Sequence, residues 1–218
     1  MPQREHTSKV PNPEEFRKTV EEAEEKYGIT DCLYRQCIEE FSRLDISQLN
    51  EAHQVRIIEP FLLTWGRMTR VLGYLGVEAI CQKLRALDAS IEPLRSKSFL
   101  SEDFDSLKKP IVELYDDIRK TSFRNAKGDL KQVGPVAASK ILHLACPDLF
   151  IMWDTNIRNR GYKKYYGDGE EYHEFLVEMR SIWKALENTI SDLQVRHGNK
   201  VTRILDQYNW MKFTEKRS

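Results

Sequence analysis

VGPVAASKILHLACPDLFIMWDTNIR, residues 133–158, joins the start of a helix to an acid that stands where another helix is expected to begin. Gly134 allows an unusual backbone dihedral, and Pro135 fits the first turn of a helix. The amide groups at such a helix start point outward and favour an anion such as a phosphate. Asp154 lies at the expected N-cap of the second helix. Both a structural helical hairpin and a DNA-binding hairpin beside a catalytic acid fit this pattern.

The rest of the chain is also predicted to be helical. Asn12, Pro13 and Gly28 have the positions of an N-cap, a first helical residue and a helix stop. Apolar residues recur at helical spacing in several further segments, namely 31–44, 51–72 with a kink at Pro60, 77–88, 110–121, 170–194 and 200–213.

No alternating strand pattern and no internal repeat is visible, so we predict an all-α fold, a multi-helix bundle. The connecting segments are short, which argues against a linker between independent domains. We therefore expect a flexible N-terminus at 1–11, a single all-α unit at 12–213 and a tail at 214–218.

Composition indicates a globular protein, because 40% of the 218 residues are hydrophobic and 31% are charged. No apolar run reaches the roughly 18 residues needed to cross a bilayer. No secretory signal is visible, so we expect an intracellular protein that does not bind a membrane. The four cysteines lack the paired spacing of metal sites, so we expect buried thiols, no metal and no cofactor.

Charge is balanced overall and uneven along the chain. The sequence has 34 Lys and Arg against 34 Asp and Glu, whereas a nucleic-acid-binding protein usually has a basic surplus. Between Arg119 and Tyr165, however, ten basic residues face only three acidic ones. One basic region on a more acidic body suits DNA binding, and a solvated charged surface is the alternative interpretation.

The motif VGP-xx-A-xx-IL, followed by an apolar run and D-T-N-I-R, resembles the signature of the helix–hairpin–helix/Gly-Pro-Asp DNA glycosylase superfamily. The glycine, proline and aspartate of that name would be Gly134, Pro135 and Asp154 in this chain. The close resemblance covers about 130–160. It implies a helix–hairpin–helix at about 122–145 and a catalytic segment at 147–160. It also implies a monomer whose partner is double-stranded DNA containing a damaged base.

The resemblance implies that Asp154 helps to expel the base, by stabilising positive charge on the deoxyribose or by activating the attacking group. In bifunctional members a lysine stands two residues after the glycine, where this chain has Val136. A monofunctional enzyme is therefore expected. Lys140 lies four residues further on the same helical face, and its long side chain is the alternative nucleophile for AP lyase activity.

Two further groups of candidate residues follow from the resemblance. The expected DNA contacts are Lys131, Val133, Gly134, Val136, Arg158 and Arg160. A flipped base needs a pocket with aromatic and polar walls, and the candidates for that pocket are Trp153, Trp65 and His143. Aromatic residues at helical spacing are often simply part of the core.

The expected function is excision of a damaged or mismatched base, with an oxidised purine such as 8-oxoguanine as the first candidate. The chain has no cysteine after Cys146, so it resembles the members without an iron–sulfur cluster, including archaeal 8-oxoguanine enzymes. The first alternative is a non-catalytic helix–hairpin–helix protein that only binds DNA. The second is an all-α interaction protein that does not meet DNA. Catalysis requires that Asp154 face a cavity beside the hairpin.

Overall fold

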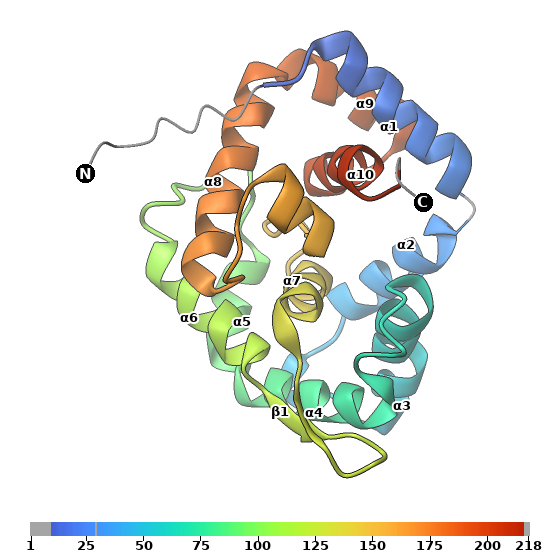
Figure 1. Cartoon of the computed structure of the whole chain (residues 1–218), viewed down its shortest axis with the longest axis vertical. Helices are drawn as coiled ribbons and strands as arrows, with labels where there is room; N and C mark the ends of the chain where they lie inside the picture. The colour runs from blue at the N-terminus through green and yellow to red at the C-terminus, as the bar shows by residue number, and fades with distance from the viewer. Residues whose placement is uncertain (1–9, 29, 216–218) are drawn as a thin grey trace.

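A computed structural model describes residues 10–28 and 30–215 and is mostly helical (Figure 1). In chain order its elements are α1 (Pro13–Tyr27), α2 (Asp31–Ser42), η1 (Ile46–Gln48), α3 (Glu51–His53), η2 (Gln54–Ile58), η3 (Pro60–Trp65), α4 (Gly73–Ala86), α5 (Asp88–Arg95), α6 (Lys108–Arg119), β1 (Ser122–Arg124), β2 (Leu130–Gln132), α7 (Gly134–Ala145), η4 (Ile157–Gly161), α8 (Gly169–Ala185), α9 (Glu187–His197) and α10 (Val201–Phe213).

The helix α1 forms as its sequence predicts. The Asn12 side chain accepts a hydrogen bond from the Glu14 amide at 2.8 Å, and Pro13 is the first helical residue. An N-cap of this kind satisfies an amide that would otherwise lack a partner at the helix start. The helix ends at Tyr27 with Gly28 as its C-cap, so both predicted ends are confirmed.

Three of the predicted helices begin, end or divide at other residues in the structure than the sequence predicts. The segment predicted as 51–72 winds into wide π turns on both sides of Pro60 and ends at Trp65, because proline has no amide for the regular ladder. The helix predicted at 77–88 already begins at Gly73, so Gly76 lies inside α4, where a Cβ would come within 3.0 Å of the Phe123 ring. The predicted helix 170–194 is two helices that meet at Leu186.

A short β-hairpin is the clearest departure from the all-α prediction. Strands β1 and β2 pair antiparallel, with Phe123 opposite Lys131. Only Phe123 is buried in this pair, so the sequence contains no alternating pattern to detect. The predicted boundaries 122–145 were therefore wrong at their start: the helix before the turn, α6, already ends at Arg119, and the β-hairpin connects it to α7.

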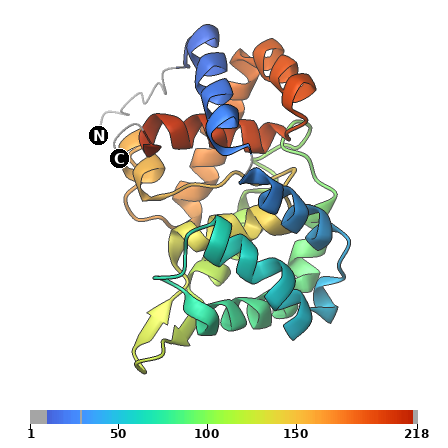
Figure 2. The same cartoon turned by 90° about the vertical axis from the view of Figure 1, so that its right-hand side faces the viewer.

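Helix α7 lies in the interior of the molecule, with α1, α9 and α10 toward one end and α3, α4 and the β-hairpin toward the other (Figures 1 and 2). It packs against α6 and α2, and Ala137 and Ala138 are fully buried at its start. Small side chains allow this close approach between helices. The Gly134 turn and the segment carrying Asp154 are thereby brought to the same central region.

The chain ends differ in part from the expectation. Residues 1–9 and 216–218 lie outside the described residues, whereas Pro11 is buried and both Thr214 and Glu215 contact the body of the protein. The described helices include none that is long and apolar enough to cross a membrane. Three cysteines are buried as expected, and Cys32 is exposed.

Candidate active site

A cavity of about 730 Å³ lies between the α1–α2 junction, the end of η3, the first turns of α7, the start of η4 and helix α10. Its walls include both candidate catalytic residues, Asp154 and Lys140. Trp65 and Val136 also line it. The cavity therefore lies directly beside the turn at Gly134, where the resemblance places the DNA-binding hairpin.

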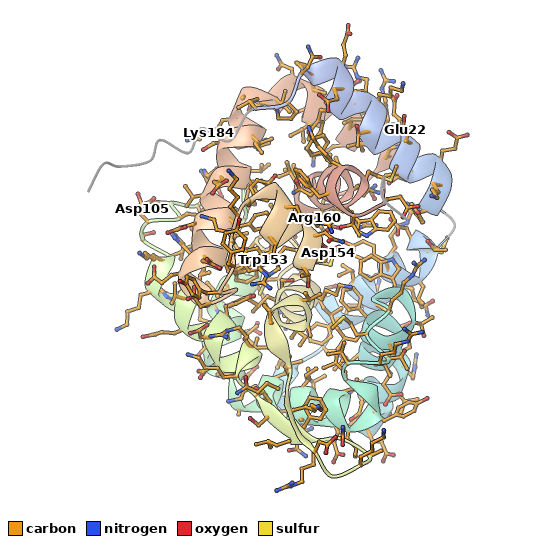
Figure 3. All side chains as sticks on the ribbon, in the orientation of Figure 1. Glu22, Asp105, Trp153, Asp154, Arg160 and Lys184 are labelled. Carbon is orange, nitrogen blue, oxygen red and sulfur yellow. The ribbon has the colours of Figure 1, made fainter. Side chains whose placement is uncertain are left out.

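Asp154 is both an N-cap and a cavity residue. Its Oδ1 accepts a hydrogen bond from the Ile157 amide at 2.8 Å, which is the predicted capping contact. Its Oδ2 accepts a hydrogen bond from the Thr214 hydroxyl at 2.6 Å. Figure 3 shows Asp154 in the central part of the molecule. The half-buried carboxylate is thus held by two different elements at the edge of the cavity.

Lys140 lies on the cavity face of α7, and its Nζ donates to the Gly66 carbonyl oxygen at 2.6 Å. Burial lowers the pKa of Lys140 to about 8, although the nearby carboxylates of Asp206 and Asp154 act in the opposite direction. At mildly basic pH a large fraction of this amine is neutral. A neutral amine is the form that can act as a nucleophile.

Trp65 forms one wall of the cavity and ends the helix η3. Its indole N–H donates to Asp31 Oδ1 at 3.2 Å, and its ring stacks on Phe61 with the centroids 5.1 Å apart. The Lys140 Nζ lies 5.9 Å from the ring centroid. This fixed ring beside the candidate catalytic residues suits the predicted stacking role.

A buried ion cluster, which sequence reasoning missed, adjoins the cavity. The Arg203 guanidinium donates from Nη2 to Asp31 at 2.9 and 2.7 Å and from Nη1 to Asp206. Burial raises the pKa of Asp206 to about 6, against the opposing effects of Arg203 and Lys140. The sequence contains no signal for Arg203 and Asp206, because the burial of all residues from Val201 to Asn209 is visible only in the folded chain. Asp31 gave no signal beyond its place near a helix start.

Of the other two predicted pocket residues, His143 belongs to the core and does not line the cavity, whereas Trp153 lines it. His143 is fully buried and donates from Nδ1 to the Phe150 carbonyl oxygen at 2.7 Å, while Nε2 accepts from the Tyr34 hydroxyl at 2.7 Å. Burial lowers the pKa of His143 to about 3, so the ring is neutral. Trp153 borders the cavity, but only 1% of it is exposed and its indole N–H donates to Tyr115 Oη. Both rings are held by core partners, so the prediction is corrected for His143, and Trp153 forms a buried part of the cavity wall.

The predicted DNA contacts divide into three groups. Lys131 and Arg160 are exposed, as a phosphate contact requires. Gly134 begins α7 with a φ of 79°, a left-handed conformation that glycine adopts without strain, and the neighbouring Val133 side chain is buried. Arg158 is also buried, and its Nη1 donates to the Tyr165 carbonyl oxygen at 3.0 Å. The prediction that Arg158 contacts a phosphate is therefore wrong for this structure, in which Arg158 holds the loop after η4.

The arrangement combines a carboxylate, a buried amine and an aromatic ring in one cavity, which suits acid–base or amine chemistry on a flat ligand. Among the described residues, no group of three or more His, Cys, Asp and Glu side chains could hold a metal ion. In comparisons with known proteins, no family model matches the chain, and neither a curated protein nor a solved structure matches it.

Proposed function

We propose that this protein is a DNA glycosylase that hydrolyses the N-glycosidic bond of a damaged or mismatched base, with Asp154 as the catalytic carboxylate. One observation carries the proposal: Asp154 and Lys140 line the same cavity of about 730 Å³, next to the Gly134 helix start. A volume of this order accommodates a small planar ligand such as a flipped base. An oxidised purine such as 8-oxoguanine is the first candidate, on the strength of the resemblance at 130–160.

Asp154 has the chemistry that this reaction requires. When the glycosidic bond breaks, positive charge develops on the deoxyribose, and a fixed carboxylate nearby stabilises it. The same group can accept a proton from an attacking water. Each carboxylate oxygen of Asp154 accepts one hydrogen bond, from Ile157 or from Thr214, and an ionised oxygen has a second lone pair for this purpose.

Lys140 offers a second chemistry in the same cavity. After the base leaves, a neutral amine can add to C1′ of the ring-opened abasic sugar and lose water to form a Schiff base, and elimination of the 3′-phosphate then cleaves the strand. Val136 stands where bifunctional members have their lysine, so this route depends on Lys140 reaching across from the next turn of α7. The products of the reaction separate the two routes, because only the amine route cuts the strand without alkali.

A non-catalytic helix–hairpin–helix protein is the alternative function. The observation that favours it is that both candidate catalytic groups already have structural partners. Asp154 caps the helical turn that leads into η4 and accepts from Thr214, and Lys140 donates to the Gly66 carbonyl oxygen. Such a protein would bind duplex DNA through the turn at Gly134 and leave every base in place.

Cleavage of duplexes carrying single lesions tests the proposal. The panel includes 8-oxoguanine, uracil, hypoxanthine and alkylated bases, and each product is analysed with and without hot alkali. Asp154→Asn keeps the helix cap, because asparagine also accepts the capping hydrogen bond, but it removes the negative charge. We expect it to lower the excision rate by about 10²- to 10⁴-fold, the usual range for loss of a general acid or base.

Asp105→Asn is the matched control. Asp105 is an exposed acid in the loop before α6, and Figure 3 shows it at the edge of the molecule, well away from Asp154. This variant is expected to excise at the wild-type rate. A folded wild-type protein that binds duplex DNA and excises no base from the panel would favour the non-catalytic alternative. Equal rates for Asp154→Asn and the wild type would remove Asp154 from the mechanism.

A further inference from the structure

Thr214 directly follows helix α10 and donates its hydroxyl hydrogen to Asp154 Oδ2 at 2.6 Å. Its backbone N–H donates to the Trp210 carbonyl oxygen at 2.9 Å, so the residue continues the last turn of α10. Thr214 and Asp154 are 60 positions apart in the chain. The contact therefore joins the end of the fold to the candidate catalytic carboxylate.

The hydrogen bond from Thr214 fixes the rotation of the Asp154 carboxylate, which the hydrogen bond from Ile157 leaves free. A single cap bond, from the Ile157 amide to Oδ1, still allows the carboxylate to rotate about the bond that joins it to Cβ. Rotation about such bonds is soft, with broad and shallow preferences. A donor on Oδ2 from a separate element removes that freedom, so the plane of the carboxylate is set relative to the cavity.

Thr214 is held in place by buried packing. Helix α10 is buried along residues Val201 to Asn209 and packs against η4, whose first residue, Ile157, donates its amide hydrogen to Asp154. The Tyr162 hydroxyl donates to Asn209 Oδ1 at 2.6 Å, and a Cβ added at Gly161 would come within 2.9 Å of the Phe213 ring. The separation between Thr214 and Asp154 is consequently determined by two helices in close contact.

We propose that Thr214 is a positioning residue for Asp154, which holds the carboxylate plane in the orientation that base excision uses. This inference rests on the proposed function. A carboxylate stabilises the developing charge on the sugar only from the correct side and distance. Loss of the hydroxyl lets the carboxylate sample other orientations, so the rate of the chemical step falls while the affinity for DNA does not.

Two substitutions at the same position separate the hydroxyl from the rest of the side chain. Thr214→Val keeps the shape and removes the donor, whereas Thr214→Ser keeps the donor. We expect Thr214→Val to lower the single-turnover excision rate by about 10- to 100-fold, as small misplacements of catalytic groups do. Thr214→Ser should restore the rate to near the wild-type value, and the Kd for the same duplex should stay unchanged in both variants.

Thr189→Val is the matched control, since Thr189 is a buried threonine in α9 and lies outside the cavity walls. All assays are run well below each variant's Tm, so that loss of folded protein does not lower the rate. An unchanged or increased rate for Thr214→Val overturns the positioning role, as does an equal loss in Thr214→Val and Thr214→Ser. If the wild type excises no base from any duplex, the proposed function itself fails and this role fails with it.

Discussion

Lys140 and His143 lie three residues apart on α7 and have opposite environments. Three residues correspond to about 300° of rotation, so the two side chains leave the helix about 60° apart. That angle turns Lys140 toward the cavity and His143 into the core, between Tyr34 and the Phe150 carbonyl oxygen. Spacing placed both residues on one broad face, and only the positions of α2 and α10 determine which of them lines the cavity.

The lowered pKa of Lys140 predicts a distinctive pH dependence for strand cleavage without alkali. Only the neutral amine attacks C1′, so the rate should rise by about tenfold per pH unit below the pKa and level off near pH 8. An ordinary lysine would keep rising to beyond pH 10. The Schiff base is measured directly, as the complex trapped on the DNA by borohydride.

Lys140→Met should abolish the trapped complex, and Lys184→Met should leave it at the wild-type level. Lys184 is an exposed lysine on α8 that Figure 3 shows far from Asp154. Excision that yields only alkali-sensitive sites, with no trapped complex at any pH, would show that water is the attacking group. Trapping that survives in Lys140→Met would assign the nucleophile to another amine.

Helix α10 shows what the sequence can and cannot predict about a single element. The apolar spacing predicted a helix at 200–213, and the structure has Val201–Phe213. The polar residues on that helix were not interpretable in the same way. Arg203 forms an ion pair with Asp31, which is 172 positions away and lies beside it only in the folded chain.

Arg203→Met should strongly destabilise the protein. The substitution leaves Asp31 and Asp206 buried without their shared cation, and breaking a buried ion pair in this way costs about 3–5 kcal/mol. Arg196→Met is the control, because Arg196 makes only half-exposed ion pairs, which contribute about 1 kcal/mol or less. The free energy of unfolding is measured by denaturation in urea for both variants. Similar losses in the two would mean that the buried cluster adds no special stability.

The cavity belongs to the whole molecule, since five separate segments contribute to it. Local patterns predicted the capping role of Asp154 and placed Lys140 on the same helical face as Val136, because both depend on residues within one or two helical turns. They could not predict the Thr214 contact, and they gave Trp65 as a pocket candidate without placing it beside Lys140. Such contacts depend on how elements far apart in the chain pack together, and the periodicity of the sequence carries no information about that packing.

Charge also acts at the scale of the whole molecule, because the net charge of zero hides a basic surplus between residues 119 and 165. Several of the basic residues between 119 and 165 already have internal partners, such as Lys164, which pairs with Glu174 and Glu178. Others are exposed around the β-hairpin and η4, namely Arg124, Lys127, Lys131, Arg160 and Lys163. These are the residues that a DNA backbone would meet.

Reversing charge on the β-hairpin should weaken duplex binding in a salt-dependent way. Lys127→Glu combined with Lys131→Glu removes two exposed cations, and each lost phosphate contact lowers the slope of log K against log salt by about 0.9. Lys18→Glu combined with Lys184→Glu changes the net charge equally on exposed parts of α1 and α8, so it controls for net charge. We expect the first pair to lose affinity most at low salt and the second pair to bind almost as the wild type does. Equal losses would indicate that only net charge matters, and no binding by the wild type would exclude DNA as the partner.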